Sequence, residues 1–125
     1  MSPENREFIL YLEDMMESMM RIEEYLNWLN FRHFKMNQMI VDATIRNFEI
    51  IGEASKNVPK DIQEKYHEIP WRKMYGLRNL IAHEYFGIDY EMIWEIAKNN
   101  LTHNRIDLAR IIEIEKAQGG KNLKK

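Results

Sequence analysis

The chain has 125 residues, the length of one domain, and 45% of them are apolar, which is enough to build a hydrophobic core. Its formal net charge of −2 excludes binding of nucleic acid through bulk positive charge, and the absence of cysteine excludes disulfides, thiolate metal sites and a cysteine nucleophile. Five glycines and three prolines are too few for a turn-rich all-β fold, so helices are expected.

The N-terminal segment carries the clearest helical pattern. Ser2 suits an N-cap and Pro3 suits the first helical residue. An apolar stripe then recurs at alternating steps of four and three, formed by Phe8, Leu12, Met15, Met19, Ile22, Leu26 and Leu29. Further apolar side chains lie beside this stripe, namely Tyr11, Met16, Met20 and Tyr25. They either widen the core face or form a second face that packs on another subunit.

A second helix is predicted from about residue 36 to 58. Its stripe consists of Met36, Ile40, Ala43, Asn47, Ile51, Ala54 and Val58. Pro59 breaks the pattern, and residues 59–68 are predicted to form a short helical turn or connector. Asn47 is polar within an apolar stripe, so its amide either bonds to a neighbouring group as a structural residue or lines a site.

Two more helices complete the prediction. Pro70 is placed to open the third helix and Gly87 to end it, with an inward face of Met74, Leu77, Leu80 and Ile81. Asp89 suits the N-cap of a fourth helix from about Tyr90 to Lys116, whose stripe is Ile93, Ala97, Leu101, Leu108 and Ile112. Four helices with short connections favour an all-α, up-and-down bundle. We expect one domain over residues 1–116 and a flexible basic tail over 117–125.

Several classes of protein find no support in the sequence. The N-terminus interrupts its apolar run with Glu13 and Asp14, unlike a signal peptide, and no run approaches the roughly 20 apolar residues of a membrane span. These features predict a cytoplasmic protein without a membrane partner. The histidines are dispersed and no glycine-rich phosphate loop is present, so neither a metal nor a cofactor is expected.

The predicted third helix contains an unusual group of polar residues. Arg72, Lys73 and Arg78 fall in a stretch without any acid from residue 69 to 83, which makes a local basic patch. Arg72 and Lys73 lie either on a solvated helix face or at a site that binds phosphate, such as that of RNA. Asn79, His83 and Tyr85 follow among apolar neighbours.

The spacing of these residues limits the kind of site they can form. Arg78 and His83 are five apart, so on a regular helix they differ by about 140° and about 7.5 Å, and a site using both needs a second wall from another helix or subunit. Imidazole exchanges protons near neutral pH and guanidinium binds phosphate, while RNA supplies its own 2′-hydroxyl nucleophile. From residue types alone, a structural Arg78 and His83 remain an open alternative.

The segment RNLIAHEY, residues 78–85, resembles the R-x4-H-x-Y form of the HEPN ribonuclease motif. That form is typical of HepT-like toxins, the partners of MNT-type minimal nucleotidyltransferase antitoxins. The resemblance extends over about residues 8–115 and includes YLEDMMESMMRIEEYL (11–26), IRNFEIIGEASKNVP (45–59), YHEIPWRKMYGLRNLIAHEYFGID (66–89) and IWEIAKNNL (93–101).

The resemblance implies a HEPN-like helical bundle that forms a homodimer. It also implies that the cleft between the two subunits cleaves RNA, either tRNA or mRNA, and that this cleavage requires no metal. Arg78 and His83 would be the catalytic pair, with Asn79 in support. Tyr85 would be the tyrosine to which the antitoxin transfers AMP. Two other readings stay open: a non-catalytic subunit that binds a nucleotide or a nucleotidyltransferase, and a plain helical dimerisation module. A test for RNA cleavage separates the ribonuclease reading from these two.

Overall fold

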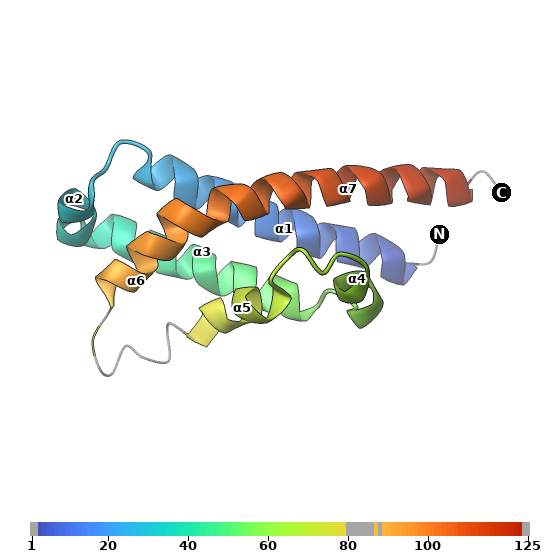
Figure 1. Cartoon of the computed structure of the whole chain (residues 1–125), viewed down its shortest axis with the longest axis horizontal. Helices are drawn as coiled ribbons and strands as arrows, with labels where there is room; N and C mark the ends of the chain where they lie inside the picture. Colours follow the sequence, from blue (N-terminus) through green and yellow to red (C-terminus); the bar gives the residue numbers. More distant parts are fainter. Residues whose placement is uncertain (1–2, 80–86, 88, 124–125) are drawn as a thin grey trace.

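The structure is a computed structural model that describes residues 3–79, 87 and 89–123. Within these residues every regular element is helical. The elements in chain order are α1 (Pro3–Leu26), α2 (Phe31–Met36), α3 (Gln38–Lys56), α4 (Lys60–Lys65), α5 (Trp71–Gly76), α6 (Tyr90–Glu95), the π-helical turn η2 (Ile96–Asn100) and α7 (Leu101–Leu123). The long helices α1, α3 and α7 run alongside one another, with short α5 on the remaining side of α3 (Figure 1). The predicted all-α up-and-down bundle is confirmed.

The core is built from one stripe of each long helix. In α1 the predicted residues from Phe8 to Leu26 are all buried, whereas Leu29 lies beyond the helix and is only partly buried. Of the side chains beside that stripe, Tyr11, Met16 and Tyr25 pack against the core and Met20 points outward. This arrangement supports the wide core face for three of the four.

The start of α3 differs from the prediction. Met36 was expected in the core stripe but is 74% exposed, because it ends the separate short helix α2 and does not begin α3. The side chain of Asn30 caps α2 by accepting from the amide of His33 at 2.8 Å, and Asn37 caps α3 by accepting from the amide of Ile40 at 3.1 Å. Two asparagine caps within eight residues therefore divide what the apolar pattern joined.

The core face of α3 is also wider than the predicted stripe. It includes Val41, Thr44, Ile45 and Phe48, whereas the expected Ile40 and Ala43 are only partly buried. Asn47 is buried and its amide donates to the carbonyl of Ala43 at 2.8 Å, while the Asn47 Oδ1 and Thr44 Oγ1 atoms have no hydrogen-bond partner among the described residues. Bonding of Asn47 to its own helix supports the structural reading.

The middle of the chain follows the prediction as far as the structure describes it. Pro59 precedes the short helix α4, which is the predicted connector. Pro70 precedes α5, where Trp71 and Met74 are buried. The α-helix ends at Gly76 and residues 77–79 continue as a 3₁₀ turn, so the third helix changes geometry ten residues before the predicted stop. Residues 80–86, with the predicted inward residues 80 and 81, lie outside the described part.

The last helical rod begins as predicted. The side chain of Asp89 accepts from the amide of Met92 at 3.0 Å, and the predicted stripe from Ile93 to Ile112 is buried. The π-helical turn η2 interrupts the rod before α7 and adds one residue to a turn of the helix. The rod extends to Leu123, past the predicted end at Lys116. None of the described helices is long and apolar enough to cross a membrane.

Candidate functional site

Arg78 lies in the 3₁₀ turn that follows α5. Leu77, the residue before it, is buried and anchors the turn in the core. The Arg78 side chain is 34% exposed, so its guanidinium group lies at the surface while its aliphatic stem is partly covered. Asn79, the next residue, is exposed. The turn therefore presents both residues to solvent from a fixed base.

Two side chains hold the guanidinium group of Arg78. Its Nε atom is 3.1 Å from Oε1 of Glu53 on α3. Its Nη1 atom donates to the hydroxyl of Tyr75 at 3.3 Å, and its Cζ atom lies 5.4 Å from the centre of the Tyr75 ring. The remaining N–H donors of the group have no partner among the residues that the structure describes. A planar cation held in this way can offer those donors to an oxyanion such as a phosphate.

Gly52 brings α3 close to the backbone of this turn. A Cβ atom at position 52 would lie 2.9 Å from the amide nitrogen of Arg78 and 3.1 Å from the carbonyl oxygen of Tyr75. Any larger residue would separate the two helices. Gly52 and Glu53 are consecutive, so one point of α3 supplies both the close contact and the anion that pairs with Arg78.

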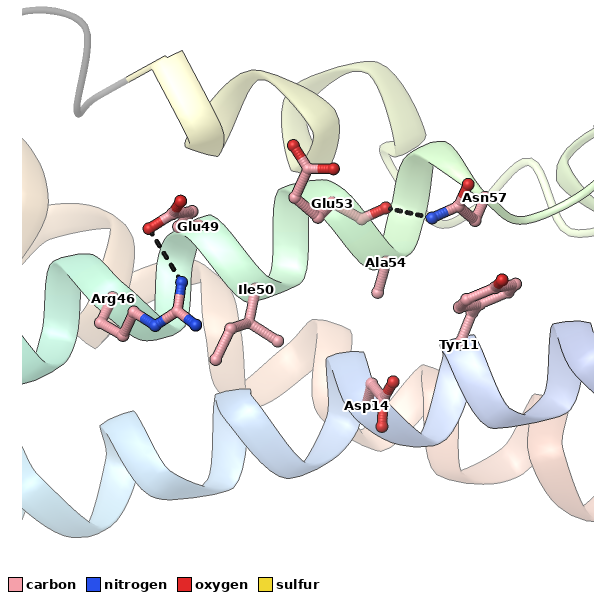
Figure 2. Close-up of a pocket in the computed structure, with 8 residues that line it drawn as sticks. All are labelled: Tyr11, Asp14, Arg46, Glu49, Ile50, Glu53, Ala54 and Asn57. Atoms are coloured by element: carbon pink, nitrogen blue, oxygen red, sulfur yellow. Dashed lines mark hydrogen bonds and ion pairs between the residues drawn. The ribbon is translucent and has the colours of Figure 1, made fainter.

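A hollow of about 250 Å³ lies between α1 and α3 on the far side of Glu53 (Figure 2). Its charged lining consists of three acids, Asp14, Glu49 and Glu53, and one cation, Arg46, and Glu53 also pairs with Arg78. Arg46 is paired with Glu49 at 3.1 Å. The excess of acid over base in this lining disfavours an anion such as phosphate. Among the described residues, no three histidine or acidic side chains are grouped as a metal site would require.

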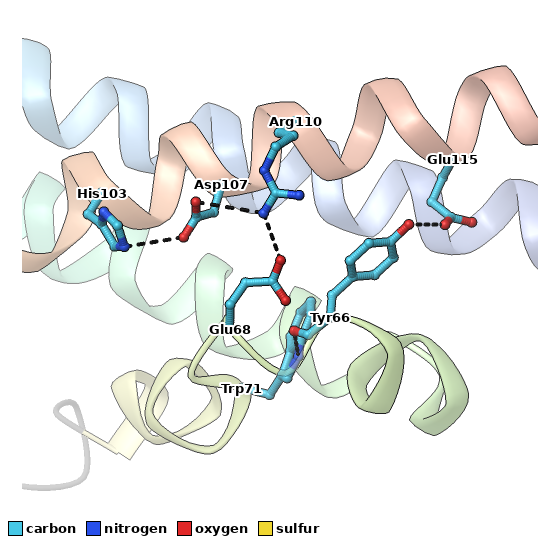
Figure 3. Close-up of polar contacts among 7 residues, drawn as sticks. All are labelled: Tyr66, Glu68, Trp71, His103, Asp107, Arg110 and Glu115. Atoms are coloured by element: carbon cyan, nitrogen blue, oxygen red, sulfur yellow. Dashed lines mark hydrogen bonds and ion pairs between the residues drawn. The ribbon is translucent and has the colours of Figure 1, made fainter.

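The segment that leads into α5 is fastened to α7 by buried and surface polar contacts (Figure 3). The Tyr66 hydroxyl donates to the carboxylate of Glu115, which also pairs with Lys65 at 2.9 Å. The indole N–H of Trp71 donates to the carbonyl of Tyr66 at 3.0 Å. Burial, followed by the hydrogen bond to Glu115, raises the pKa of the Tyr66 hydroxyl. Tyr66 therefore stays a neutral donor.

A second contact binds the same segment to α7 at the surface. Arg110 Nη2 donates to Glu68 Oε2 at 2.7 Å, and this hydrogen bond lowers the pKa of Glu68. Arg110 is also 3.8 Å from Asp107, which in turn lies 3.3 Å from His103 (Figure 3). Together with Tyr66, these contacts fix the position from which α5 starts and thus the turn at residue 78.

The structure brings together part of the predicted site. Arg78 and Asn79 are adjacent and accessible, and Arg72 and Lys73 are exposed on α5. The predicted residues 83 and 85 lie outside the described part of the chain. The pairing of Arg78 with the histidine and its closeness to the tyrosine therefore stay predictions.

Sequence reasoning left two roles open for Asn47 and missed two residues. Asn47 is five residues from Gly52, which places it about 140° away around α3 from the side that meets Arg78. Gly52 and Glu53 had no predicted role. The available signal was the glycine itself, because an isolated glycine within a helix costs about 1 kcal/mol and usually marks a close contact.

Comparison with known proteins places the chain in a family. The family described as ribonuclease HepT-like matches residues 15–114. A candidate RNase of Methanocaldococcus jannaschii is 42% identical over 96 residues, covering 77% of this chain and 88% of the relative. A protein of Thermococcus cleftensis named as a probable ribonuclease HepT is 42% identical over 91 residues, covering 73% of this chain and 83% of the relative.

A third relative, a candidate RNase of Caldanaerobacter subterraneus, is 34% identical over 106 residues, which cover 85% of this chain and 95% of the relative. No solved structure gives a significant match. The matched region includes α3, α5 and the turn that carries Arg78. The chain therefore belongs to the ribonuclease HepT-like family.

Proposed function

We propose that this protein is a metal-independent endoribonuclease that acts as the toxin of a toxin–antitoxin pair. Membership of a ribonuclease family gives the class of enzyme. The observation that carries the proposal is the state of Arg78. Its guanidinium group is oriented by Glu53 and Tyr75, is partly exposed, and has further N–H donors that no described residue occupies. This is the arrangement expected of a group that stabilises charge on a scissile phosphate.

In the proposed reaction the 2′-hydroxyl of RNA attacks the neighbouring phosphorus atom. His83 of one subunit accepts the hydroxyl proton, and His83 of the second subunit donates a proton to the departing 5′-oxygen. Arg78 stabilises the added negative charge of the pentacoordinate phosphate, and Asn79 orients the phosphate. The products are a 2′,3′-cyclic phosphate and a free 5′-hydroxyl. No metal ion is needed, because the nucleophile, the proton acceptor and the cation are all supplied.

A homodimer follows from the spacing of the pair. Five residues separate Arg78 from His83, which is about 140° on a regular helix, so one helix cannot aim both at the same phosphate. A cleft between two copies lets the arginine of each chain meet a histidine from the other.

Neutralisation is proposed to occur by transfer of AMP to the Tyr85 hydroxyl from an MNT-type nucleotidyltransferase antitoxin. Tyr85 is seven residues from Arg78, which is close to two helical turns, so both residues share a face of a regular helix. The added phosphate is an anion, and beside Arg78 it would occupy the N–H donors that RNA requires. The modification therefore blocks the site by charge as well as by bulk.

The test is cleavage of total RNA and of tRNA in EDTA. Intact mass is measured first, to establish that Tyr85 carries no AMP. We expect the parent to cleave and both Arg78→Ala and His83→Ala to lose activity by about 100-fold or more. Arg32→Ala and His33→Ala are the matched controls, because both residues are exposed on α2. Full activity in His83→Ala would overturn the mechanism, and an inactive, folded, unmodified parent would favour a binding subunit.

A further inference from the structure

A second hollow lies upstream of Arg78, between α4 and the start of α5. Its volume is about 500 Å³. Three cationic side chains line it: Lys60 at the start of α4, and Arg72 and Lys73 on α5. His67, from the connection between these helices, adds an imidazole. The sequence placed two of these cations side by side, and the fold brings two more nitrogen-bearing side chains to them.

The charge of this hollow suits an anion. Glu64 is the one acid of its lining, so the lining carries a net charge of +2 with His67 neutral, on a chain whose total is −2. None of the ion pairs formed among the described residues involves Lys60, Arg72 or Lys73. Their charges are therefore available to a ligand, in contrast to Arg46 in the acidic hollow between α1 and α3.

The base of the hollow is held in place before any ligand binds. Trp71 is buried in the lining, and its indole N–H is bonded to the carbonyl of Tyr66. Tyr66 and Glu68 flank His67 and are both bound to α7, through Glu115 and Arg110. The cationic rim is thus mounted on a fixed frame, which reduces the entropy cost of binding.

We propose that this hollow, defined by Lys60, His67, Arg72 and Lys73, is a subsite for backbone phosphates of the RNA strand outside the bond that is cut. The inference rests on the proposed function, because the strand it holds leads to Arg78. Arg72 and Arg78 are six residues apart, about 10 Å along the helical backbone and about 120° around it on a regular helix, so a strand that curves around α5 can place neighbouring nucleotides at both. The acidic hollow between α1 and α3 lies on the other side of α3 from α5, and it disfavours an approach of the RNA strand from that side.

The subsite contacts phosphate and not bases, so it predicts a particular salt dependence. Each phosphate contact with a single strand contributes a slope of about −0.7 in log affinity against log salt concentration. Removing two contacts therefore makes the slope less negative by about 1.4. Relative to about 1 M salt, this weakens binding about 25-fold at about 0.1 M salt. Loss of a contact to a base would leave the slope unchanged.

The experiment uses a fluorescent RNA of about 15 nucleotides with 2′-O-methyl groups, which cannot be cleaved because its nucleophile is blocked. Binding is measured by anisotropy over a range of salt concentrations. The test variant is Lys60→Ala/Arg72→Ala. The control is Arg32→Ala/Lys35→Ala, which removes the same two residue types from α2. The two residues of the test pair and the two of the control are all exposed. We expect the large loss of affinity and of slope in the test pair only.

Equal effects of the two double variants, or no effect of either, would overturn the subsite. Circular dichroism checks folding, and Lys60→Gln/Arg72→Gln, which keeps longer polar side chains, replaces the alanine pair if that pair unfolds. Cleavage of a dinucleotide, which has a single phosphodiester, separates the two proposals. The subsite predicts unchanged dinucleotide cleavage and a higher KM for long RNA in the test pair. An inactive parent that still shows the difference in salt slope would refute the ribonuclease mechanism and keep the phosphate site.

Discussion

Replacing Gly52 with alanine tests whether α3 fixes the position of Arg78. The new Cβ atom would lie 2.9 Å from the Arg78 amide nitrogen, 3.0 Å from its Cβ and 3.1 Å from the Tyr75 carbonyl oxygen. Two of these three atoms belong to the backbone and cannot rotate away. Ordinary contact begins at 3.4 Å, so the turn must move away from α3 by about half an ångström.

The cost can be set against a matched substitution. Overpacking of this size costs about 1–3 kcal/mol, while alanine gains about 1 kcal/mol over glycine in a helix. Gly76→Ala is the control, because it lies in α5 and a Cβ atom there meets nothing within 4 Å. Gly76 is the last residue of α5, so its propensity gain is at most that at Gly52, and Gly52→Ala should be less stable than Gly76→Ala by up to about 3 kcal/mol. Urea unfolding at one protein concentration measures this difference.

Activity gives a second measurement of the same shift. A misplacement of 1 Å can reduce a rate about 100-fold, so half an ångström at Arg78 should reduce kcat/KM for RNA about tenfold. Gly76→Ala should keep the activity of the parent. If Gly52→Ala is as stable as Gly76→Ala and cleaves RNA normally, then α3 does not fix the turn, and the role given to Gly52 is wrong.

Three further predictions follow from the contacts around the turn. Glu53→Gln keeps the shape of the side chain but removes the charge beside Arg78. We expect single-turnover cleavage to slow about tenfold, while RNA binding measured by anisotropy stays unchanged. Weaker binding would contradict a purely orienting role. Tyr66→Phe removes the hydrogen bond to buried Glu115 and should lower the free energy of urea unfolding by about 1–3 kcal/mol, a result refuted by an unchanged midpoint. Because the pKa of Glu68 is lowered by Arg110, the stabilisation is present above the ordinary glutamate pKa and disappears as the pH falls through the lowered value. Arg110→Gln should therefore reduce the urea midpoint at neutral pH and approach the parent in acid, and a gap that does not change with pH would exclude this cause.

Periodicity was sufficient to predict most of the bundle. The stripes of α1 and of the α6–α7 rod are regular over many turns, and such long patterns are the most reliable signal in a single sequence. It failed where capping competes with periodicity. The apolar spacing carried the second helix back to Met36, but Asn30 and Asn37 each satisfy free amides and so create two helix starts. A capping asparagine does not interrupt the spacing of the apolar residues, so the apolar pattern did not reveal it.

The candidate site was predictable only in part, for a physical reason. The motif residues are close in sequence, so Arg78 and its neighbours could be chosen by residue type and resemblance. Glu53 meets Arg78 only because α3 packs against α5, and Lys60 shares a hollow with Arg72 although it belongs to a different helix. No local spacing encodes such contacts between elements. The acidic hollow between α1 and α3 and the basic hollow between α4 and α5 were hidden for the same reason, since their linings come from different elements.

The π-helical turn η2 has a consequence for how the chain can change in length. Deleting one residue from a regular α-helix turns everything after it by about 100° and would carry the core stripe of α7 into solvent. In residues 96–100 the rod already contains one residue more than an α-helix needs. A single deletion there can restore regular helix while Leu101 and Leu108 keep facing the core. Length variation in this rod is therefore expected to concentrate at η2, where relatives can differ by a residue and still share one bundle.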